Sequence, residues 1–424
     1  MDLLSDLAAR GLIHDTTDKR ALTSRLAAGP VGIYIGFDPS ADSLHAGHLV
    51  GQLFLRRFQL AGHRPFPLAG GATGMIGDPS GRREERAMLD VDSLRHNVEC
   101  IGRQLRRLLD FEPGPTQATL VSNADWTEPI SLLAFLRDVG KYVPVNQMLA
   151  KDSVRSRLDS ESGISYTEFS YSLLQANDFR HLFERHGVEV QGGGSDQWGN
   201  IVAGVDLIRR RLGAQAHAVT HPLITNASGD KMGKTASGAV WLDAARTSPY
   251  QFHQFWVQTE DQLVGTYTKV LSLRPLPEIE AGLAAHEAAP ERRAAQRALA
   301  DELTSLVHGA EAATAATDAA AVLFGGDPLA ASAAALETLV AEVPSSRLGA
   351  EQLRDIVAVL LDTGLAASNS EARRLLQQGA VRVNGAVITA ADDLTAIGPL
   401  HGRYLVLRKG KRTHHVVEIS RRGG

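Results

Sequence analysis

Residues 31–55 decide the fold and read VGIYIGFDPSADSLHAGHLVGQLFL. The first seven, residues 31–37, are mostly apolar and include β-branched side chains, which predicts a buried strand. Asp38, Pro39 and Ser40 form a polar turn, and an apolar helical pattern follows it. A strand, a turn and a helix in this order predict the first repeat of an α/β fold with a parallel sheet.

The same pattern continues as far as about residue 225. Further strand candidates, alternating with helical patterns, are residues 65–69, 118–122, 188–191 and 218–223. Three of the five strands end in turns of small or polar residues, at 38–40, 70–74 and 192–196. Ligands of open α/β sheets bind outside the carboxyl ends of the strands, so we expect the site there.

The remainder of the chain divides into three parts. Strand patterns disappear after about residue 240, and residues 226–325 predict a helical domain that begins with a loop. An Ala-rich region with Gly and Pro follows, and we expect a linker over residues 326–350. Residues 351–424 then predict a small separate α+β module.

This last module carries signals for RNA binding. Ser368 and Glu371 form a capping-box pattern at the start of a short basic helix, and Gly379 stands where its C-terminal cap is expected. Asn384-Gly385 between two apolar runs predicts a hairpin. After residue 400 the chain contains one acid, Glu418, and seven bases: Arg403, Arg408, Lys409, Lys411, Arg412, Arg421 and Arg422. Such a run of basic residues is often only a solvated face, but beside a basic helix and a hairpin it favours a role in RNA binding.

Composition describes a globular chain without membrane or disulfide features. The formal net charge is −4, with 44% hydrophobic and 22% charged residues, so any nucleic-acid site must be local. The acidic start differs from a basic secretory signal, and no stretch reaches the roughly 18 apolar residues of a membrane helix. The lone Cys100 is interpreted as a small buried residue. We therefore expect a cytoplasmic protein.

The pair His45 and His48 is close to what chance gives among fifteen histidines, and only its context makes it informative. It begins a helix after a strand, where free backbone N–H groups and the helix dipole attract phosphate. Gly47 leaves room for a flat base against the backbone. A purely capping role remains an alternative, and so does a metal site, although neither Cys nor a third His lies nearby in the sequence.

Residues 231–235, KMGKT, are the rarer signal. Only eight of the 44 basic residues are Lys, and two of them lie in this segment. Small and polar residues surround it and predict a mobile loop. Two ammonium groups on such a loop suit a pyrophosphate that must be held as it leaves. The alternative is an exposed basic turn.

Together these segments resemble the HIGH and KMSKS motifs of class I aminoacyl-tRNA synthetases. Longer stretches resemble bacterial tyrosyl-tRNA synthetases: residues 34–48, 70–81 (GGATGMIGDPSG), 167–171 (TEFSY) and 193–200 (GGSDQWGN). The resemblance runs nearly end to end and includes a C-terminal segment similar to the S4 RNA-binding domain. It implies a Rossmann-like parallel-sheet catalytic domain over 1–225, a helical domain over 226–325, a linker over 326–350 and an S4-like domain over 351–424.

The resemblance also implies a role for each matching residue of the amino-acid site. Tyr34 and Asp178 match the positions that bind a phenol. Asp78, Tyr171 and Gln175 match those that hold the α-ammonium, for which one carboxylate and two neutral acceptors suit three donors. The remaining two positions are Asp38, between amino acid and nucleotide, and Gln197, near the carboxylate.

The nucleotide and RNA positions follow in the same way. The ATP-binding set that the resemblance implies is Asp38, Gly47, His48, Gly193, Asp196 and Lys234. The catalytic set around the phosphates is Ser40, His45, His48, Arg82, Arg86, Lys231, Lys234 and Thr235. The tRNA-binding set is Arg209, Arg210, Arg373, Arg374, Arg408, Lys409, Lys411 and Arg412. Mg²⁺ is expected with ATP, bound chiefly through phosphates, and no protein ligand for a metal is assigned.

Some residues depart from the commoner family pattern. Ile35 stands where Cys is often found, Gly51 replaces a polar residue, Ser40 a Thr and Arg82 a Lys. These changes concern nucleotide contacts and leave the reaction intact. Gly233 in place of Ser is a familiar variant.

Three other functions compete with activation of tyrosine and its transfer to tRNA(Tyr). One is a tryptophanyl-tRNA synthetase, against which Tyr34 and Asp178 argue. The second is a nucleotidyltransferase that uses no tRNA, against which the basic C-terminal module argues. The third is an RNA-binding protein with a decayed core, which the intact histidines and lysines oppose. The family further implies a homodimer, with one tRNA lying across both subunits.

Overall fold

The computed structural model describes residues 2–80, 89–159, 163–226, 228–229, 232–235 and 238–420. It divides into two compact units. Unit 1 comprises Met1–Thr247 and Thr259–Gln296, and unit 2 comprises Ser248–Gln258 and Arg297–Gly424. Within the described parts of the chain, the search for a helix that could span a membrane finds none.

Unit 1 is built on a six-stranded sheet, in which β1 alone runs antiparallel to its neighbour. In spatial order the strands are β1 (Asp15–Thr16), β6 (His217–His221), β5 (Val188–Gly194), β2 (Gly32–Phe37), β3 (Arg64–Ala69) and β4 (Val121–Ser122). The predicted strands at 31–37, 65–69 and 188–191 are confirmed, and β5 continues into the glycine run. The α/β class is confirmed with them.

Strand β4 is shorter than the predicted strand over 118–122, and the prolines of β3 explain this. The N–H of Arg64 donates to the carbonyl of Val31, the residue just before β2, so alternate N–H groups of β3 point toward β2. The intervening positions, which face β4, include Pro65 and Pro67, and proline has no N–H to donate. Only Leu68 and Ala69 therefore pair with β4.

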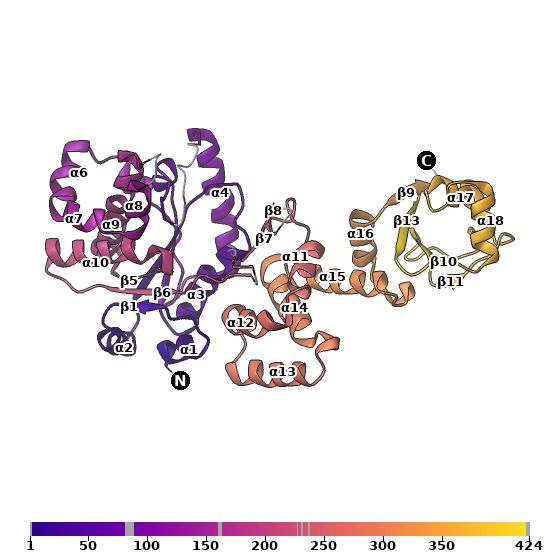
Figure 1. Ribbon diagram of the computed structural model, residues 1–424, viewed down its shortest axis with the longest axis horizontal. Coiled ribbons are helices and arrows are strands. Elements are labelled where there is room, and N and C mark those ends of the chain that lie inside the picture. Colours follow the sequence, from indigo (N-terminus) through magenta and orange to yellow (C-terminus); the bar gives the residue numbers. More distant parts are fainter. Residues whose placement is uncertain are drawn as a thin grey trace. The chain divides into compact units, whose positions relative to one another are not determined.

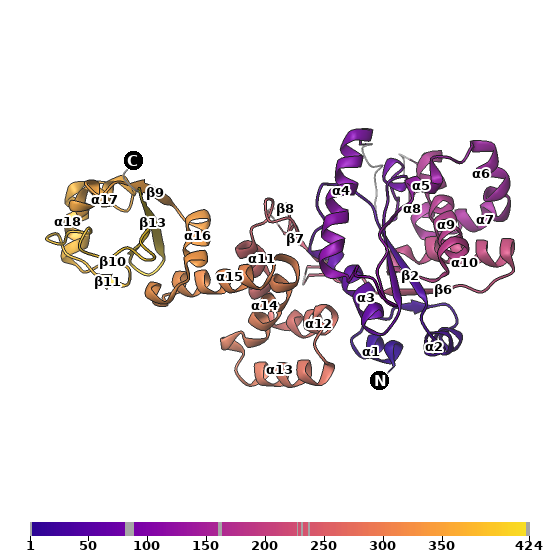
Figure 2. The same cartoon turned by 180° about the vertical axis from the view of Figure 1, so that it is seen from behind.

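Helices cover both faces of this sheet, as Figure 1 and the reverse view in Figure 2 show. Helices α3 (Leu49–Leu60) and α4 (Val91–Leu108) lie on one face, and α9 (Tyr166–His186) and α10 (Trp198–Leu212) lie on the other. Cys100 is buried in α4, as expected. A buried cluster fills the space under α9 and α10 and consists of Tyr34, Phe66, Leu68, Phe179, Leu182, Val188, Ile208 and Ala216.

The order of the strands fixes where a ligand binds. From β2 the chain moves to β3 and β4 on one side, and later to β5 and β6 on the other. The crossover connections therefore diverge between β2 and β5, and a crevice opens outside the carboxyl ends of these two strands. Phe37 and Gly194 end these two strands.

The other α-helices described wholly within unit 1 have between 4 and 13 residues. They are α1 (Leu3–Ala9), α2 (Lys19–Ala27), α5 (Ala124–Thr127), α6 (Leu132–Asp138), α7 (Val145–Leu149), α8 (Asp152–Leu158), α12 (Asp261–Leu271) and α13 (Leu276–Ala288). The loop of residues 231–235 contributes β7 (Lys234–Thr235), which pairs with β8 (Gly238–Ala239).

Unit 2 combines helices with a five-stranded sheet. Its helices are α11 (Pro249–Val257), most of α14 (Ala294–His308), α15 (Ala310–Leu323), α16 (Ala333–Glu342), α17 (Ile356–Asp362) and α18 (Asn369–Gln377). The sheet order is β11 (Ala386–Val387), β10 (Val381–Val383), β12 (Tyr404–Lys409), β13 (Thr413–Ile419) and β9 (Ser345–Leu348). The helical character predicted after residue 240 is confirmed.

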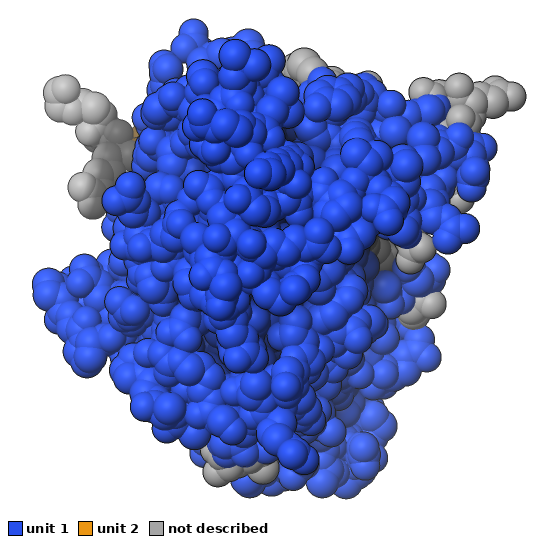
Figure 3. All heavy atoms as spheres, turned by 90° about the vertical axis from the view of Figure 1, so that its left-hand side faces the viewer, with its two compact units in different colours: residues 1–247, 259–296 blue, residues 248–258, 297–424 orange. Residues whose placement is uncertain are grey.

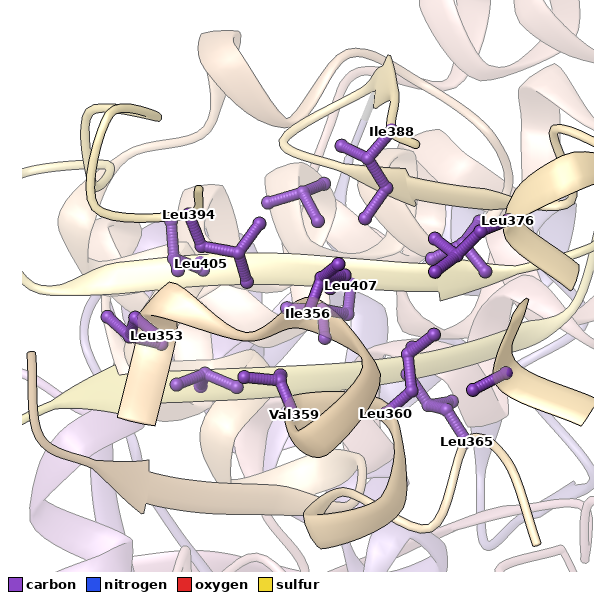
Figure 4. Close-up of a cluster of buried hydrophobic side chains, with 14 of the residues drawn as sticks. Leu353, Ile356, Val359, Leu360, Leu365, Leu376, Ile388, Leu394, Leu405 and Leu407 are labelled. Carbon is purple, nitrogen blue, oxygen red and sulfur yellow. The ribbon is translucent and has the colours of Figure 1, made fainter. Parts of the chain in front are cut away.

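Alternation along β12 gives this sheet a core on each face. Leu405 and Leu407 face α17 and α18 in the cluster of Figure 4. Tyr404 and Val406 face the opposite way and pack with residues of α15 and α16. The central strands β12 and β13 are therefore buried on both faces over much of their length.

Two predicted local structures are confirmed. Ser368 caps α18 by accepting from the N–H of Glu371, and Gly379 follows the helix with φ +60°. Asn384 and Gly385 both have positive φ, as the two-residue hairpin turn requires. Residues 326–350, expected as a linker, instead contain α16 and β9, because α16 buries Leu336 and Leu339 and β9 pairs with β13.

Candidate active site

A cavity of about 700 Å³ lies in unit 1 at the carboxyl ends of β2 and β5. Its wall contains all seven predicted amino-acid residues: Tyr34, Asp38, Asp78, Tyr171, Gln175, Asp178 and Gln197. Six of the predicted nucleotide residues also line it: Ser40, His45, Gly47, His48, Gly193 and Asp196. Residues from separate parts of the chain thus meet in one pocket at the strand ends.

The two predicted phenol-binding residues are deeply buried. Tyr34 on β2 is 1% exposed, and its hydroxyl donates to the carbonyl of Gln175 at 3.5 Å. Asp178 on α9 is 2% exposed and accepts from Asn123 Nδ2 at 3.0 Å and from Trp126 Nε1 at 2.8 Å. Burial raises the pKa of Asp178 to about 7, although both donors favour the ionised form.

Hydrogen bonds connect Asp178 to Asp38, which is predicted to lie between amino acid and nucleotide. Asn123 Nδ2 also donates to Thr73 Oγ1 at 2.9 Å, and Thr73 Oγ1 donates to Asp38 Oδ1 at 2.8 Å. The other oxygen of Asp38 accepts from the Tyr171 hydroxyl at 2.8 Å. Burial, reinforced by Asp38, raises the pKa of Tyr171 well above its ordinary value, so it stays a donor. This series of hydrogen bonds fixes the orientation of the carboxylates of Asp178 and Asp38.

A second group of hydrogen bonds holds Asp78. Gln197 Nε2 donates to Asp78 Oδ2 at 2.6 Å, and the N–H of Ser80 donates to Oδ1 at 2.9 Å. Behind them, Lys151 Nζ donates to Asn200 Oδ1 at 3.1 Å. Burial lowers the pKa of Lys151 to about 8, opposed by the charge of Asp78.

The two histidines begin the turn before α3. The N–H of His45 donates to His48 Nδ1 at 3.0 Å, and the N–H of Gly47 donates to His45 Nδ1 at 3.1 Å. Because both Nδ1 atoms accept, each neutral ring carries its proton on Nε2. The ring centroids are 4.0 Å apart. The pair therefore presents two imidazoles side by side at the pocket wall.

Glycines bring the loop of residues 231–235 against this turn. A Cβ at Gly47 would lie 2.8 Å from the carbonyl oxygen of Met232. A Cβ at Gly233, where φ is +87°, would lie 2.8 Å from the Gly47 nitrogen. The backbone contact requires the absence of both side chains. The N–H of Ala46 donates to Val240, and that of Val240 to Gly233, which ties the segments together.

The glycine run at the end of β5 gives close backbone access. A Cβ at Gly193 would lie 3.0 Å from Ile201 Cδ1, and one at Gly194 would lie 2.7 Å from Asp196 Oδ1. His221 ends the next strand and also lines the cavity. Its Nδ1 lies 3.0 Å from the carbonyl oxygen of Pro222, and burial lowers its pKa.

Some predicted residues lie elsewhere or outside the described residues. Arg82, Arg86 and Lys231 fall outside them, and Lys234 and Thr235 are described by backbone alone, as β7. The RNA candidates are not in the pocket. Arg209 and Arg210 lie in the last turn of α10 and form ion pairs with Asp206. The others belong to unit 2: Arg373 and Arg374 on α18, Arg408 and Lys409 on β12, and Lys411 and Arg412 in the following turn.

Several supporting residues of the pocket were not predicted. They are Thr73, Asn123, Trp126, Lys151, Gln191, Asn200 and His221. Asn123 and Trp126 follow strand β4 directly, so their place at a strand end was the available signal. No comparable signal marks Lys151, because its partner Asn200 is 49 residues away.

Comparison with known proteins supplies the context for this pocket. A family model described as tRNA synthetases class I (W and Y) matches residues 26–325. A second, described as the tyrosine–tRNA ligase SYY-like C-terminal domain, matches residues 335–417. The chain is thus similar to this family in both its α/β part and its C-terminal part.

Curated relatives and solved structures agree. The chain is 52% identical to the tyrosine–tRNA ligase of Opitutus terrae, over 99% of this chain and 100% of that one. It is 48% identical to that of Roseiflexus castenholzii, over 98% and 99%. A truncated mitochondrial tyrosyl-tRNA synthetase of Aspergillus nidulans is 34% identical, with a TM-score of 0.70 over 76% of this chain and 94% of that one. A Plasmodium falciparum tryptophanyl-tRNA synthetase, 16% identical with a TM-score of 0.54, shares the fold.

Proposed function

The chain belongs to the class I tRNA synthetases for tryptophan and tyrosine, and from this premise we propose how its pocket works. It is a tyrosine–tRNA ligase that uses ATP. In the first step a tyrosine carboxylate oxygen attacks the α-phosphorus of ATP, the α–β phosphoanhydride breaks, and pyrophosphate leaves. In the second, a ribose hydroxyl at the 3′ end of tRNA(Tyr) attacks the tyrosyl carbonyl, and AMP leaves.

We propose that Tyr34 and Asp178 bind the tyrosine phenol. The supporting observation is the buried carboxylate of Asp178, whose two oxygens are already oriented by Asn123 and Trp126. A pocket that leaves buried polar groups unpaired when phenylalanine enters rejects that substrate, and tyrosyl-tRNA synthetases are the standard example. A tryptophan indole has no hydroxyl to satisfy the same pair.

Asp78, Tyr171 and Gln175 hold the α-ammonium in this proposal, and Gln197 lies near the substrate carboxylate. The hydrogen bond from Tyr171 to Asp38 joins the amino-acid and nucleotide sides. The orientation of these groups before substrate arrives supports catalysis by positioning, because carboxylate is already a nucleophile and pyrophosphate a leaving group.

In this proposal ATP binds at the carboxyl ends of β2 and β5. Asp196 accepts from the ribose hydroxyls, Gly193 allows the ribose to approach, and Gly47 admits the base. Ser40, His45 and His48 contact the phosphates. Arg82, Arg86, Lys231, Lys234 and Thr235 surround the departing pyrophosphate by resemblance alone. Mg²⁺ enters on the phosphates of ATP, without an assigned protein ligand.

We further propose that tRNA contacts both units, through Arg209 and Arg210 in unit 1 and through the basic residues of unit 2. These are Arg373, Arg374, Arg408, Lys409, Lys411 and Arg412. Guanidinium groups bind phosphate bidentately, which suits an RNA backbone. A cytoplasmic location belongs to this proposal as well, and cell fractionation tests it.

A homodimer is supported by exposed apolar side chains on α6 and α7. The side of unit 1 with these helices faces the viewer in Figure 3. The exposed fractions are 70% for Leu132, 79% for Leu133, 42% for Leu136, 59% for Val145 and 41% for Leu149. Apolar side chains gathered on one side of a protein mark an interaction surface, and we propose a second copy of this chain as the partner.

Aminoacylation separates this function from its competitors. The purified chain is incubated with ATP, bacterial tRNA and labelled tyrosine or tryptophan, and the acid-precipitable label is measured. We expect label from tyrosine on tRNA(Tyr). Formation of tyrosyl-adenylate without charged tRNA would instead identify a tRNA-independent nucleotidyltransferase. Charging of tRNA with tryptophan alone would show that tyrosine is not the substrate.

A further inference from the structure

Two residues of helix α9 hold the side chain of Trp126. The indole Nε1 donates to Asp178 Oδ1 at 2.8 Å, and the indole ring stacks on the imidazole ring of His181. The ring centroids are 4.5 Å apart, and the ring planes differ by 12°. Asp178 and His181 are three positions apart on α9, so they project from the same side of the helix. One helix thus contacts Trp126 both at its N–H and on its face.

The stack with His181 supplies what the hydrogen bond to Asp178 cannot. An indole has a single polar atom, its N–H donor, so the ring can turn about that one hydrogen bond without breaking it. Trp126 is half-buried and lies on the four-residue helix α5. Contact of one flat ring with another removes this rotation, because stacked aromatic pairs have a preferred geometry. The plane of the indole is therefore set by His181.

The other donor to Asp178 is fixed in a different way. Asn123 is 0% exposed, and its Oδ1 accepts from the backbone N–H of Ala72 at 2.7 Å. Its Nδ2 donates to Thr73 Oγ1 as well as to Asp178. These bonds determine where the Asn123 amide points without any contribution from α9 beyond Asp178 itself. Of the two donors that orient the carboxylate, Trp126 is therefore the one that depends on a stacked ring.

The stacked pair can influence the substrate only through Asp178. Of the described residues, the cavity wall includes Asp178 but neither Trp126 nor His181. Asp178 is 2% exposed, so the direction of its oxygens decides which donor of a substrate it can accept from. A displaced indole would leave one of these oxygens without its partner, and a buried carboxylate oxygen without a donor is costly.

The imidazole acts as a neutral ring. Burial and the nearby charge of Arg180 lower the pKa of His181 below its ordinary value of 6.5, so at pH 8 the ring carries no charge. It therefore contributes packing rather than an electrostatic field at Asp178. A phenylalanine ring at the same position should provide the same flat face, whereas a leucine of similar size should not.

We propose that His181 is a positioning residue for the selection of tyrosine, which holds the Trp126 ring so that its N–H keeps Asp178 directed at the substrate phenol. This inference rests on the proposed binding of the phenol by Tyr34 and Asp178. Because His181 contacts neither substrate, its loss should affect the choice of amino acid and leave the use of ATP unchanged.

Steady-state ATP–pyrophosphate exchange at pH 8 tests the selectivity. The full chain carrying His181→Ala, His181→Leu or His181→Phe is assayed with tyrosine and with phenylalanine. We expect Ala and Leu to lower the ratio of kcat/KM for tyrosine to that for phenylalanine by about 2- to 10-fold, the range of one lost aromatic contact. The change should lie in the KM for tyrosine, with the KM for ATP unaltered, and Phe should restore the ratio.

His186→Ala is the matched control, because His186 is an exposed histidine of the same helix and its ring lies 6.3 Å from that of His181. It should retain the wild-type ratio. A general loss of stability would reduce activity with both amino acids and would not change their ratio. An unchanged ratio in both His181→Ala and His181→Leu would overturn the proposal, and so would a His181→Phe variant as unselective as His181→Ala.

A second measurement follows the indole directly. Hydrogen–deuterium exchange of the Trp126 N–H is measured by NMR, with the signal assigned by its absence in Trp126→Phe. We expect faster exchange of this proton in His181→Ala and His181→Leu than in the wild type or His186→Ala. Equal rates in all four proteins would show that His181 does not hold the indole. A wild-type chain without tyrosine-dependent pyrophosphate exchange would instead refute the proposed function.

Discussion

Asp178 connects the proposed selectivity of the pocket with the stability of the fold. Its carboxyl group has an ordinary pKa of 3.8, and burial raises the pKa to about 7 in the folded chain. Between these values the folded protein holds a proton that the unfolded chain has released. The free energy of unfolding should therefore fall as pH rises from about 4 to about 7, by on the order of a few kcal/mol, and level off above.

Urea unfolding of the wild type and of Asp178→Asn between pH 5 and pH 8 measures this effect. The substitution lowers the free energy of unfolding by an amount that does not vary with pH, because Asn cannot accept from both Asn123 and Trp126. The free energy of unfolding of the wild type relative to the variant should rise toward low pH, where Asp178 is protonated in the folded chain. A difference that does not vary with pH would contradict the buried, proton-holding carboxyl.

The buried ion pair between Arg157 on α8 and Glu168 on α9 stabilises the helix that supplies Tyr171 and Asp178. The side chains are 3% and 2% exposed and form two hydrogen bonds, of 3.0 and 2.7 Å. Arg157→Met leaves a carboxylate buried without its partner, so we expect a loss of about 3–5 kcal/mol in the free energy of unfolding.

Chemical denaturation compares this variant with Arg95→Met, which removes an ion pair whose partners are 69% and 92% exposed. The control should change stability by less than about 1 kcal/mol. Equal losses in the free energy of unfolding for the two variants would mean that the burial of the Arg157–Glu168 pair does not matter for stability.

The residues predicted to contact a substrate line the cavity, whereas the residues that orient them were not predicted. Tyr34, Asp78 and Asp178 stand within or near stretches similar to a known family, and they line one cavity. Trp126 and Lys151 act through hydrogen bonds to distant residues, which no local pattern encodes. Their roles required the three-dimensional arrangement of β4, α5 and α8 around the pocket.

At the scale of elements, the contact between the turn before α3 and the loop of residues 231–235 depends on glycine. Gly47→Ala places a Cβ 2.8 Å from the Met232 carbonyl oxygen, so one segment must move. We expect kcat for ATP–pyrophosphate exchange to fall on the order of 10²-fold, with a smaller change in the KM for tyrosine, because misplaced phosphate ligands affect the transition state most.

Gly282→Ala is the matched control, because its Cβ would meet nothing within 4 Å in the middle of α13. It should leave exchange unchanged and stabilise the fold by about 0.5–1 kcal/mol. Exchange by Gly47→Ala at the wild-type rate would show that the close approach is dispensable.

Strands and turns with strong sequence signals could be predicted. Where an element begins and ends, however, depended on the elements packed beside it. The strand at 31–37 and the hairpin around Asn384-Gly385 carry their own signals. Strand β4 is shortened by prolines in the adjacent strand, which its own sequence does not reveal. Helix α16 was missed because it is rich in Ala between Gly and Pro, and only packing against β12 and β13 selects the helix.

At the scale of the whole molecule, the proposed dimer predicts a measurable mass. Sedimentation equilibrium should give twice the chain mass of 45.4 kDa. Replacing Leu132 and Leu133 together by Asp places two charges on the exposed apolar side of α6, and we expect a monomer. The control Leu60→Asp, at a similarly exposed apolar position, should remain a dimer. A monomeric wild type would refute the proposed partner.

The central claim is that this pocket selects tyrosine through a buried pair, Tyr34 and Asp178, and it predicts a clear result in one assay. Amino-acid-dependent ATP–pyrophosphate exchange is measured with each of the twenty amino acids, for the wild type and for Asp178→Asn. Tyrosine should support exchange by the wild type, with phenylalanine and tryptophan far below it, and the substitution should reduce the preference for tyrosine over phenylalanine. Exchange with tryptophan and not tyrosine, or an unchanged preference in Asp178→Asn, would contradict the account.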